Sequence, residues 1–389
     1  MDPVSVWDEL VGQHKAVEVL QRALSGASHA MTHAWLIVGP PGSGRSNAAR
    51  AFAAALQCDA QGCGHCNDCR TALTGAHPDV TLHRTEKLSI GIKEARELAG
   101  RGNVSPVQQK HQVVVIEDAD RLTERGADAL LKALEEPAPK TVWLLCAPSA
   151  DDLIVTIRSR CRELRLVTPS VESVTDLLIR RDGIDPALAA HCARVAQGHV
   201  GRARALARHD DVRIRRHSIL TLPTRLESLG DCLTAAEVMV GASSQDADKA
   251  TAELDAREMA ELQVALGFSG TGSRARHAQG AIRELEEEQK TRAKRIQRDA
   301  LDSMLTELTG FYRDVLAIQS APDVELVNAD LEDQIEPLAR RSTPEQTIRA
   351  LDAILEARVA LETNVAPLLA MEALMVSLAR SARPEPAQP

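Results

Sequence analysis

The chain has 389 residues, and its 46 Lys or Arg residues against 55 Asp or Glu residues give a net charge of −9, which excludes a uniformly basic protein that coats DNA. Hydrophobic residues make up 44% of the chain, which excludes a disordered tail protein and predicts a sizeable core. Aromatic residues are only 2%, too few for a protein that stacks single-stranded bases on aromatic side chains.

The first part of the chain alternates between strand and helix patterns. Short apolar runs predict strands, and apolar residues at helical spacing predict helices. The predicted strands are 34–38, 80–83, 113–116, 141–147 and 161–167. The predicted helices are 17–24, 46–56, 92–98 and 126–136, the last ended by Pro137. Strands separated by helices predict an α/β domain whose mostly parallel sheet has helices on both faces.

After Pro169 the patterns are all helical. Segments 171–181, 186–196 and 198–207 predict a small helical domain, and the periodic segments from about 211 to 381 predict an all-α domain. An apolar stripe from Leu351 to Leu369 predicts one long C-terminal helix.

Two segments of the second half have unusual composition. Residues 241–280 are rich in Gly, Ala, Ser and charge, and their weak periodicity predicts a partly flexible segment. Residues 282–299 are densely charged, and the spacing of Glu288 and Arg292 predicts an exposed helix. A nucleic-acid role for the basic half of this helix is an alternative. Residues 382–389 predict a disordered tail.

A glycine-rich loop lies between the first predicted strand and the next helix. It consists of Gly39, Pro40, Pro41, Gly42, Ser43, Gly44, Arg45 and Ser46. In this context the backbone N–H groups turn toward phosphate oxygens, and the helix N-terminus adds its dipole. The pattern requires Lys where this chain has Arg45, a longer and planar cation. Two interpretations remain: the loop binds ATP and Mg²⁺, or it keeps the fold and binds nucleotide weakly or not at all.

Two acids, Glu117 and Asp118, follow the strand 113–116. The expected order is Asp to hold magnesium and then Glu to polarise the attacking water. Here the order is reversed, so the carboxylate that would activate water is one methylene shorter. Together with Arg45, this order predicts that hydrolysis by the chain alone is absent or very slow.

Four cysteines lie within twelve residues. Cys58, Cys63, Cys66 and Cys69 have the spacing C-x4-C-x2-C-x2-C, which suits a tetrahedral Zn²⁺ ion with a structural role. His65 is an alternative to one of these ligands, and free thiols or a disulfide are the alternative to a metal site. The other four cysteines, Cys146, Cys161, Cys192 and Cys232, are isolated and are predicted to be buried or incidental.

Two arginines follow the acid pair in the chain. Arg160 lies between two predicted strands, where ring-shaped nucleotide hydrolases carry an arginine that points into the neighbouring subunit's site. Arg202 opens the last helix of the small domain and could reach back toward a bound nucleotide. The alternatives are an ordinary surface arginine and a helix-start residue.

Local charge clusters give a further prediction. Residues 202–216 contain six Arg and two Asp, which predicts either a phosphate-attracting patch or a solvated hinge. Residues 323–336 contain six acids and no base, which predicts a solvated loop or a face that repels nucleic acid.

These motifs, in this order, resemble the delta prime family of the bacterial DNA polymerase III clamp loader. The matching segments are 7–13, 58–69, His77-Pro78-Asp79, 129–137, 157–161 and, more loosely, 362–370. Residues 241–280 have no counterpart in the family pattern.

The resemblance implies three domains and a role in replication. The domains are an AAA+ ATPase-like domain (1–167) with the zinc module 58–69, a small helical lid (168–210) and a helical collar (211–381) with an insertion near 241–280. The implied function is that of a subunit in a hetero-pentameric loader that places the sliding clamp on primed DNA. In this family delta prime lends an arginine finger, here Arg160, to an adjacent ATPase subunit. The implied partners are the gamma/tau and delta subunits, the sliding clamp, and primed DNA, indirectly or through its phosphates.

Two other functions compete with this one. The first is an active ATPase subunit of the gamma/tau type, which shares the fold and the zinc module; Arg45 and the order Glu117-Asp118 argue against it. The second is a recombination-type AAA+ motor, with which the cysteine cluster is hard to reconcile.

The compartment is predicted from the same sequence. No stretch approaches ~18 consecutive apolar residues, so no membrane-spanning helix is expected. The first ten residues include Asp2, Asp8 and Glu9 but no basic residue, unlike a secretory signal or transit peptide. We therefore expect a cytoplasmic protein whose cysteines are reduced or metal-bound.

Overall fold

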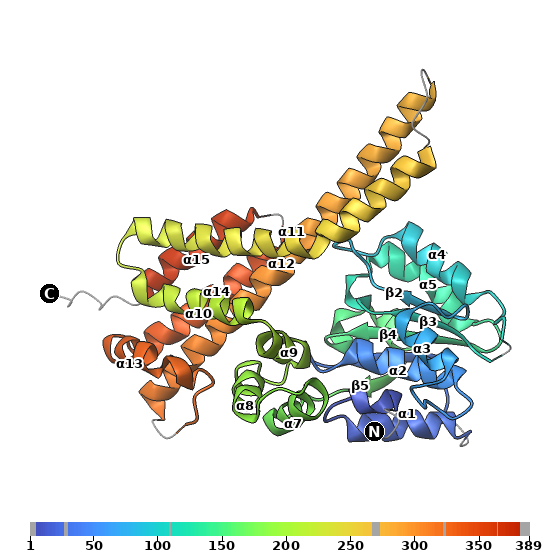
Figure 1. Ribbon diagram of the computed structural model, residues 1–389, viewed down its shortest axis with the longest axis horizontal. Helices are drawn as coiled ribbons and strands as arrows, with labels where there is room; N and C mark the ends of the chain where they lie inside the picture. The colour runs from blue at the N-terminus through green and yellow to red at the C-terminus, as the bar shows by residue number, and fades with distance from the viewer. Residues whose placement is uncertain are drawn as a thin grey trace. The chain divides into compact units, whose positions relative to one another are not determined.

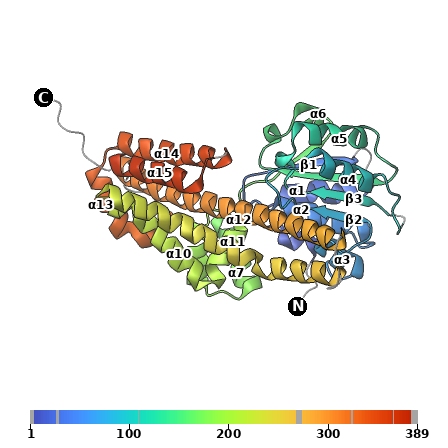
Figure 2. The same ribbon diagram turned by 90° about the horizontal axis from the view of Figure 1, so that it is seen from above.

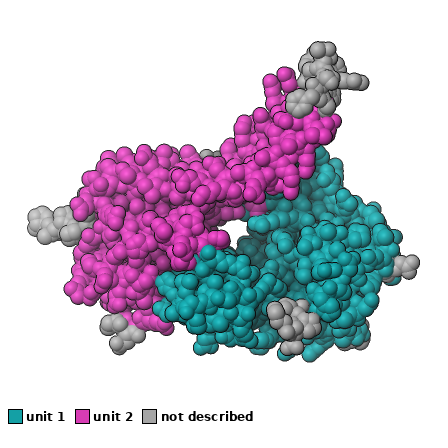
Figure 3. Space-filling model, viewed as in Figure 1, with its two compact units in different colours: residues 1–208 teal, residues 209–389 magenta. Residues whose placement is uncertain are grey.

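The computed structural model describes residues 5–26, 30–108, 110–266, 273–321, 324–363 and 365–381. The chain divides into two compact units, residues 1–208 and residues 209–389 (Figure 3). The first is built on a sheet, and the described residues of the second form helices without a strand, so the predicted fold class is confirmed. Within the described residues, no helix has both the length and the hydropathy needed to cross a membrane. The predicted tail, 382–389, lies outside them.

The first unit contains a five-stranded parallel sheet in the order β2-β3-β4-β1-β5. The strands are β1 (Ala34–Val38), β2 (Val80–His83), β3 (Gln112–Ile116), β4 (Thr141–Ala147) and β5 (Arg162–Arg165). Each predicted strand is present within two residues of its predicted ends. The three central strands are buried along their whole length, as expected for a parallel sheet covered on both faces.

Helices cover the two faces of the sheet (Figures 1 and 2). Trp35 and Ile37 of β1 pack with α1 (His14–Leu24) and α2 (Arg45–Gln57), while Leu36 packs on the opposite face with α4 (Ile92–Gly102) and α5 (Glu124–Glu135). Shorter elements of this part are η1 (Val6–Glu9), α3 (Asn67–Thr74), η2 (Ala119–Arg121), η3 (Ala150–Asp152) and α6 (Val155–Arg158). Consecutive strand residues thus enter two separate apolar layers.

Three short helices complete the first unit. They are α7 (Val171–Asp182), α8 (Pro186–Val195) and α9 (Val200–Arg208), as the sequence predicts. The fully buried carboxylate of Asp182 accepts hydrogen bonds from Arg204 at 2.8 Å and Arg208 at 2.6 Å, which joins α7 to α9. Burial opposes ionisation of Asp182, but the two guanidinium groups lower its pKa overall.

The described residues of the second unit form helices and the segments that connect them, without a strand. The helices are α10 (Asp210–Thr221), η4 (Leu222–Arg225), α11 (Leu229–Leu266), α12 (Ser273–Ser320), η5 (Ala329–Leu331), α13 (Glu332–Arg341), α14 (Pro344–Glu362) and α15 (Pro367–Ser381). Leu305, Phe311, Ile354 and Leu374 belong to their shared apolar core.

The predicted basic patch at 202–216 is largely neutralised. Arg204 and Arg208 bind Asp182, and Arg215 pairs with Asp246. Arg216 is buried, with its Nε 2.6 Å from the Oε2 atom of Glu307. The prediction of a phosphate-attracting patch therefore needs correction, because these guanidinium groups mostly bind the protein's own acids. The alternative of a hinge between domains agrees with the division of the chain between Arg208 and His209.

The prediction of one long C-terminal helix is wrong. Helix α14 ends at Glu362, Thr363 has an extended backbone, and α15 begins at Pro367. Proline lacks an N–H donor and pushes the preceding residue out of the helical region, so the helix is interrupted there. Leu355 and Leu369 of the predicted stripe are 53% and 59% exposed.

The predicted partly flexible segment, 241–280, is helical in its described residues, 241–266 and 273–280. Helices α11 and α12 lie side by side (Figures 1 and 2). The buried side chains of this pair include the small residues Ser243, Ala247 and Thr251 on α11. Arg292 on α12 is also buried. Because these buried side chains are small or charged, the hydrophobic periodicity of the sequence does not reveal that they are buried. The prediction that the helix at 282–299 is exposed is likewise wrong for Arg292.

Candidate nucleotide loop, arginine finger and metal centre

The glycine-rich loop connects β1 to α2 at the carboxyl edge of the sheet. Gly42 and Gly44 have φ angles of 83° and 93°, the left-handed conformation that glycine adopts without strain. Gly44 is the N-cap of α2, and Ser43 donates its N–H to the Pro40 carbonyl at 3.1 Å. Gly39, in turn, donates to the Pro148 carbonyl after β4 at 3.2 Å. The loop therefore has the local context that the sequence predicts, between a strand and a helix N-terminus.

Arg45 folds back onto its own loop. Its guanidinium donates a hydrogen bond to the Gly39 carbonyl. Burial lowers the pKa of Arg45, and the nearby carboxylates of Asp118 and Asp120 oppose this shift. The cation that stands where the pattern requires Lys is thus held by the loop backbone.

The acid pair follows β3, and its first member already has a partner. The carboxylate of Glu117 is buried and accepts a hydrogen bond of 2.6 Å from the Nε atom of Arg50 on α2. Asp118 lies beside it as the N-cap of η2. No sequence motif includes Arg50. Its place one turn after Ser46, on the helix that the loop opens, is the local sign that it lies near the acid pair.

The segment before α9 reaches the glycine-rich loop. A Cβ atom built on Gly42 would lie 2.3 Å from the Cγ atom of His199, so the imidazole is packed against the loop backbone. Arg202 donates its backbone N–H to the Nδ1 atom of His199 at 3.2 Å, and its guanidinium contacts the Val195 carbonyl at 3.4 Å. Arg202 thus lies near the start of α9, as predicted. The contact between His199 and Gly42 was not predicted from the sequence.

Gln13 connects the loop to the end of the sheet. Its side-chain amide donates to the Ser43 carbonyl at 3.2 Å and to the Val167 carbonyl at 2.6 Å, and it accepts the Val167 N–H at 3.0 Å. The N-terminal motif 7–13 therefore positions both the loop and the connection to α7.

Arg160 lies just after α6 with a one-third exposed side chain. It donates hydrogen bonds to the Thr156 carbonyl at 2.6 Å and to the Ser159 hydroxyl at 3.2 Å, and it pairs with Glu135 of α5. These partners come from α5 and α6 and not from the glycine-rich loop. The Arg160 guanidinium is thus engaged within its own unit, while one third of the side chain remains exposed.

The four clustered cysteines come together as predicted. Their sulfur atoms all lie within 4.8 Å of one another. Backbone N–H groups donate to the sulfurs in sequence: Cys63 to Cys58 at 3.5 Å, Cys66 to Cys63 at 3.4 Å, and Cys69 to Cys66 at 3.3 Å. Four convergent thiol ligands fit a tetrahedral zinc ion. His65 instead directs Nδ1 to the Cys63 carbonyl, 2.9 Å away.

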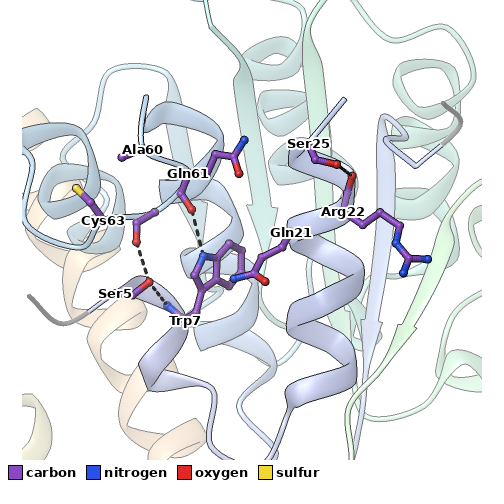
Figure 4. A pocket seen from close by; sticks show the side chains of 9 residues that line it. Ser5, Trp7, Gln21, Arg22, Ser25, Ala60, Gln61 and Cys63 are labelled. Atoms are coloured by element: carbon purple, nitrogen blue, oxygen red, sulfur yellow. Dashed lines mark hydrogen bonds between the residues drawn. The ribbon is translucent and has the colours of Figure 1, made fainter. Parts of the chain in front are cut away.

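The cysteine module is fixed to the N-terminal motif. Gly62 has a φ angle of 107°, and its carbonyl accepts the Val6 N–H at 3.1 Å. The indole of Trp7 donates to the Gln61 carbonyl at 3.1 Å, beside a cavity of about 620 Å³ between η1, the end of α1 and the cysteine loop (Figure 4). A glycine is required at position 62 because a Cβ there would lie 2.6 Å from Val6.

The motif His77-Pro78-Asp79 has a structural place. The buried carboxylate of Asp79 accepts the N–H groups of Val107 at 2.6 Å and Gln108 at 2.9 Å, and His77 accepts the N–H of Asp79. This motif therefore fixes the start of β2 to the loop before β3.

Comparison with known proteins finds sequences that are similar to this chain. A family model described as DNA polymerase III, delta subunit matches residues 12–170. A Bacillus subtilis protein named DNA polymerase III subunit delta' is 26% identical over 351 residues, covering 90% of this chain and 91% of that protein. The Haemophilus influenzae subunit delta' is 34% identical over 172 residues, covering 43% and 52%. A Mycobacterium bovis subunit gamma/tau is 32% identical over 169 residues, covering 41% and 29%.

The matches differ in extent. This chain spans about half the length of the Haemophilus relative and less of the gamma/tau relative, but nearly all of the Bacillus relative. The predicted resemblance to the delta prime subunits is confirmed by these matches and by the family model.

Proposed function

We propose that this chain, which resembles the delta prime subunits, is the delta prime-type subunit of a DNA polymerase III clamp loader in the cytoplasm. The observation that carries the proposal is the similarity to a subunit delta' over 90% of the chain. In this role it helps to load the sliding clamp on primed DNA, together with gamma/tau and delta subunits. Its own contact with DNA is indirect or made to backbone phosphates.

The state of the phosphate site supports a subunit with little or no hydrolysis of its own. Arg45 is bound to the Gly39 carbonyl, and Glu117 is tied to Arg50. If ATP and Mg²⁺ bind, Gly39 to Ser46 would hold the phosphates, and Glu117 and Asp118 would face the metal. A carboxylate already paired with a guanidinium is a poor ligand for a cation, because the two positive charges compete for it.

The cysteine module supports a structural Zn²⁺ ion bound by Cys58, Cys63, Cys66 and Cys69. Thiolates in a closed set of four leave no position for a reacting water, so the ion would stabilise the fold rather than take part in catalysis. Because Gln61 and Gly62 of the cysteine loop accept hydrogen bonds from Trp7 and Val6, the metal would also fix the N-terminal segment.

The three domains that we propose for the chain are residues 1–167, 168–210 and 211–381. Support for assembly through the last one comes from an apolar patch at the junction of α14 and α15. We define this patch as Leu355, Val359, Val365, Leu368 and Leu369, all exposed. They belong to α14, to α15 and to the residues between these helices, and exposed apolar side chains are often used in protein–protein contacts.

Arg160 is proposed as an arginine finger for a neighbouring ATPase subunit. Its position just after α6 and its partly exposed side chain support this role, which requires Arg160 to leave its ion pair with Glu135. Such arginines change hydrolysis rates by about 10³-fold or more. With a gamma/tau subunit, clamp and primed DNA present, Arg160→Ala should lower the partner's stimulated ATP hydrolysis at least tenfold.

The matched control for this experiment is Arg158→Ala, which removes a neighbouring arginine that pairs with Asp151. Unchanged stimulated hydrolysis with Arg160→Ala would show that the finger role is wrong. ATP turnover by this chain alone, abolished by Ser46→Ala, would instead favour the second candidate, an active subunit of the gamma/tau type. The 32% identity to a gamma/tau subunit is the observation that favours that candidate.

A further inference from the structure

His199 occupies an unusual position against the glycine-rich loop. A Cβ atom on Gly42 would lie 2.3 Å from Cγ and 2.6 Å from Cα of His199. Contacts this short show that the ring and backbone of His199 rest directly on the Gly42 backbone. Only glycine at position 42 permits that approach, and its φ of 83° also suits glycine.

The backbone before α9 fixes His199 in this position. Gly198 has a φ angle of 82°, and a Cβ there would lie 2.4 Å from the Thr168 methyl group and 2.6 Å from the Pro169 carbonyl. Residue 167, just before this connection, is held in turn by Gln13. The imidazole itself caps α9 by accepting the N–H of Arg202. His199 is therefore positioned by its packing against Gly42 and by its hydrogen bond to the start of α9.

The charges around His199 suit a phosphate group. Burial lowers the pKa of His199, and the charges of Arg202 and Arg45 lower it further, so the imidazole is neutral at pH 7. The charges of Arg45 and Arg202 thus act on His199, which packs on the loop that opens α2. Guanidinium groups and a helix N-terminus attract a nucleoside triphosphate.

We propose that His199 is a plug that closes the glycine-rich loop to nucleotide. The loop still opens the N-terminus of α2 and carries Arg45, but His199 fills the space against Gly42. Nucleotide binding then requires His199 to move away. The inference concerns binding by this chain and does not depend on its role in a clamp loader.

The test measures binding of a fluorescent ATP analogue with Mg²⁺ to the full chain. His199→Ser removes the ring while keeping an oxygen that caps α9. His199→Phe keeps the bulk and loses the cap. We expect His199→Ser to bind the analogue at least tenfold more tightly than the unmodified chain, and His199→Phe to bind no better than it. His217→Ser, at an exposed histidine of α10, is the matched control and should also behave like the unmodified chain.

Equal affinity of the unmodified chain and His199→Ser, whether tight or undetectable, would overturn the plug. Binding restored by Arg45→Lys but not by His199→Ser would show that Arg45 is the obstacle. Thermal melting checks that each variant folds. If His199→Ser does not, His199→Asn repeats the comparison, because asparagine also caps helices.

Discussion

The side chains of Arg45 and Glu117 lie where a nucleotide site needs a cation and an acid that are available to ligands. Both are instead engaged within the protein, Arg45 with the Gly39 carbonyl and Glu117 with Arg50. The substitution of Arg for Lys is visible in the sequence. The pairing of Glu117 with Arg50 is not, because the two residues are 67 positions apart.

The cysteine cluster gives a prediction at the residue scale. Cys69 is fully buried, so Cys69→Ser should leave three thiolates around the metal and release it. We expect zinc content measured by mass spectrometry to fall from one ion per chain to below about half, and the melting temperature to fall by about 5 °C.

Cys161→Ser is the matched control for the metal measurement, since Cys161 is half-buried and isolated from the cluster. It should keep the full zinc content. Less than about half a zinc ion per chain in the freshly purified, unmodified protein would contradict the proposed metal site.

At the scale of elements, the pairing of α11 with α12 depends on polar contacts. Arg292 is 7% exposed and lies 2.7 Å from Asp255 and 2.9 Å from Glu258. Gln297 adds a hydrogen bond of 2.7 Å to Ser244. Since such contacts require specific partners, they fix the alignment of the two helices more narrowly than apolar packing does.

Removing the buried guanidinium should therefore loosen the helix pair. Arg292→Met leaves Asp255 and Glu258 without this cation, at a cost of about 3 kcal/mol. Hydrogen exchange of α11 around these acids should become about 100-fold faster, a factor that follows from the same energy. Lys290→Met, at an exposed position, is the control and should change little.

The loss of stability caused by Arg292→Met should also depend on pH. The hydrogen bond from Arg292 lowers the pKa of Glu258, so the pair stabilises the fold fully above the unfolded glutamate pKa of about 4.3. That contribution is lost as the pH falls through the lower folded pKa. The stability difference between the unmodified chain and Arg292→Met should thus be constant near neutral pH and shrink below about pH 4. A difference that grows on acidification would rule out the ion pair.

On the scale of the whole molecule, each unit has its own core and its own task in the proposed function. The first unit carries the glycine-rich loop, the acid pair, Arg160 and the four clustered cysteines. The second unit carries the apolar patch, whose side chains are exposed. An assembly role for the second unit follows from this division.

A charge placed in the apolar patch should therefore weaken assembly without unfolding the chain. Val359 is 61% exposed, so Val359→Glu should leave the melting temperature nearly unchanged. We expect its affinity for a gamma/tau subunit, measured by titration calorimetry, to fall at least tenfold. Val107→Glu, at a 73% exposed position of the first unit, is the control. Equal affinities of Val359→Glu and the unmodified chain would show that the patch is not an interface.

The sequence by itself determined the sheet, its strands and the convergence of the four cysteines. These depend on local patterns: apolar runs predict buried strands, and short spacings bring thiols together. The break between α14 and α15 also has a local signal, Pro367, which the prediction of one long helix did not take into account.

Only the tertiary structure decided which charges are free and what touches the glycine-rich loop. Arg50 with Glu117, Arg216 with Glu307 and Arg292 with Glu258 are pairs between distant segments, and no periodic pattern reports them. His199 reaches Gly42 because the chain returns to the loop after the sheet is complete. A sequence motif specifies which groups are present, whereas packing determines which of them remain available to a ligand.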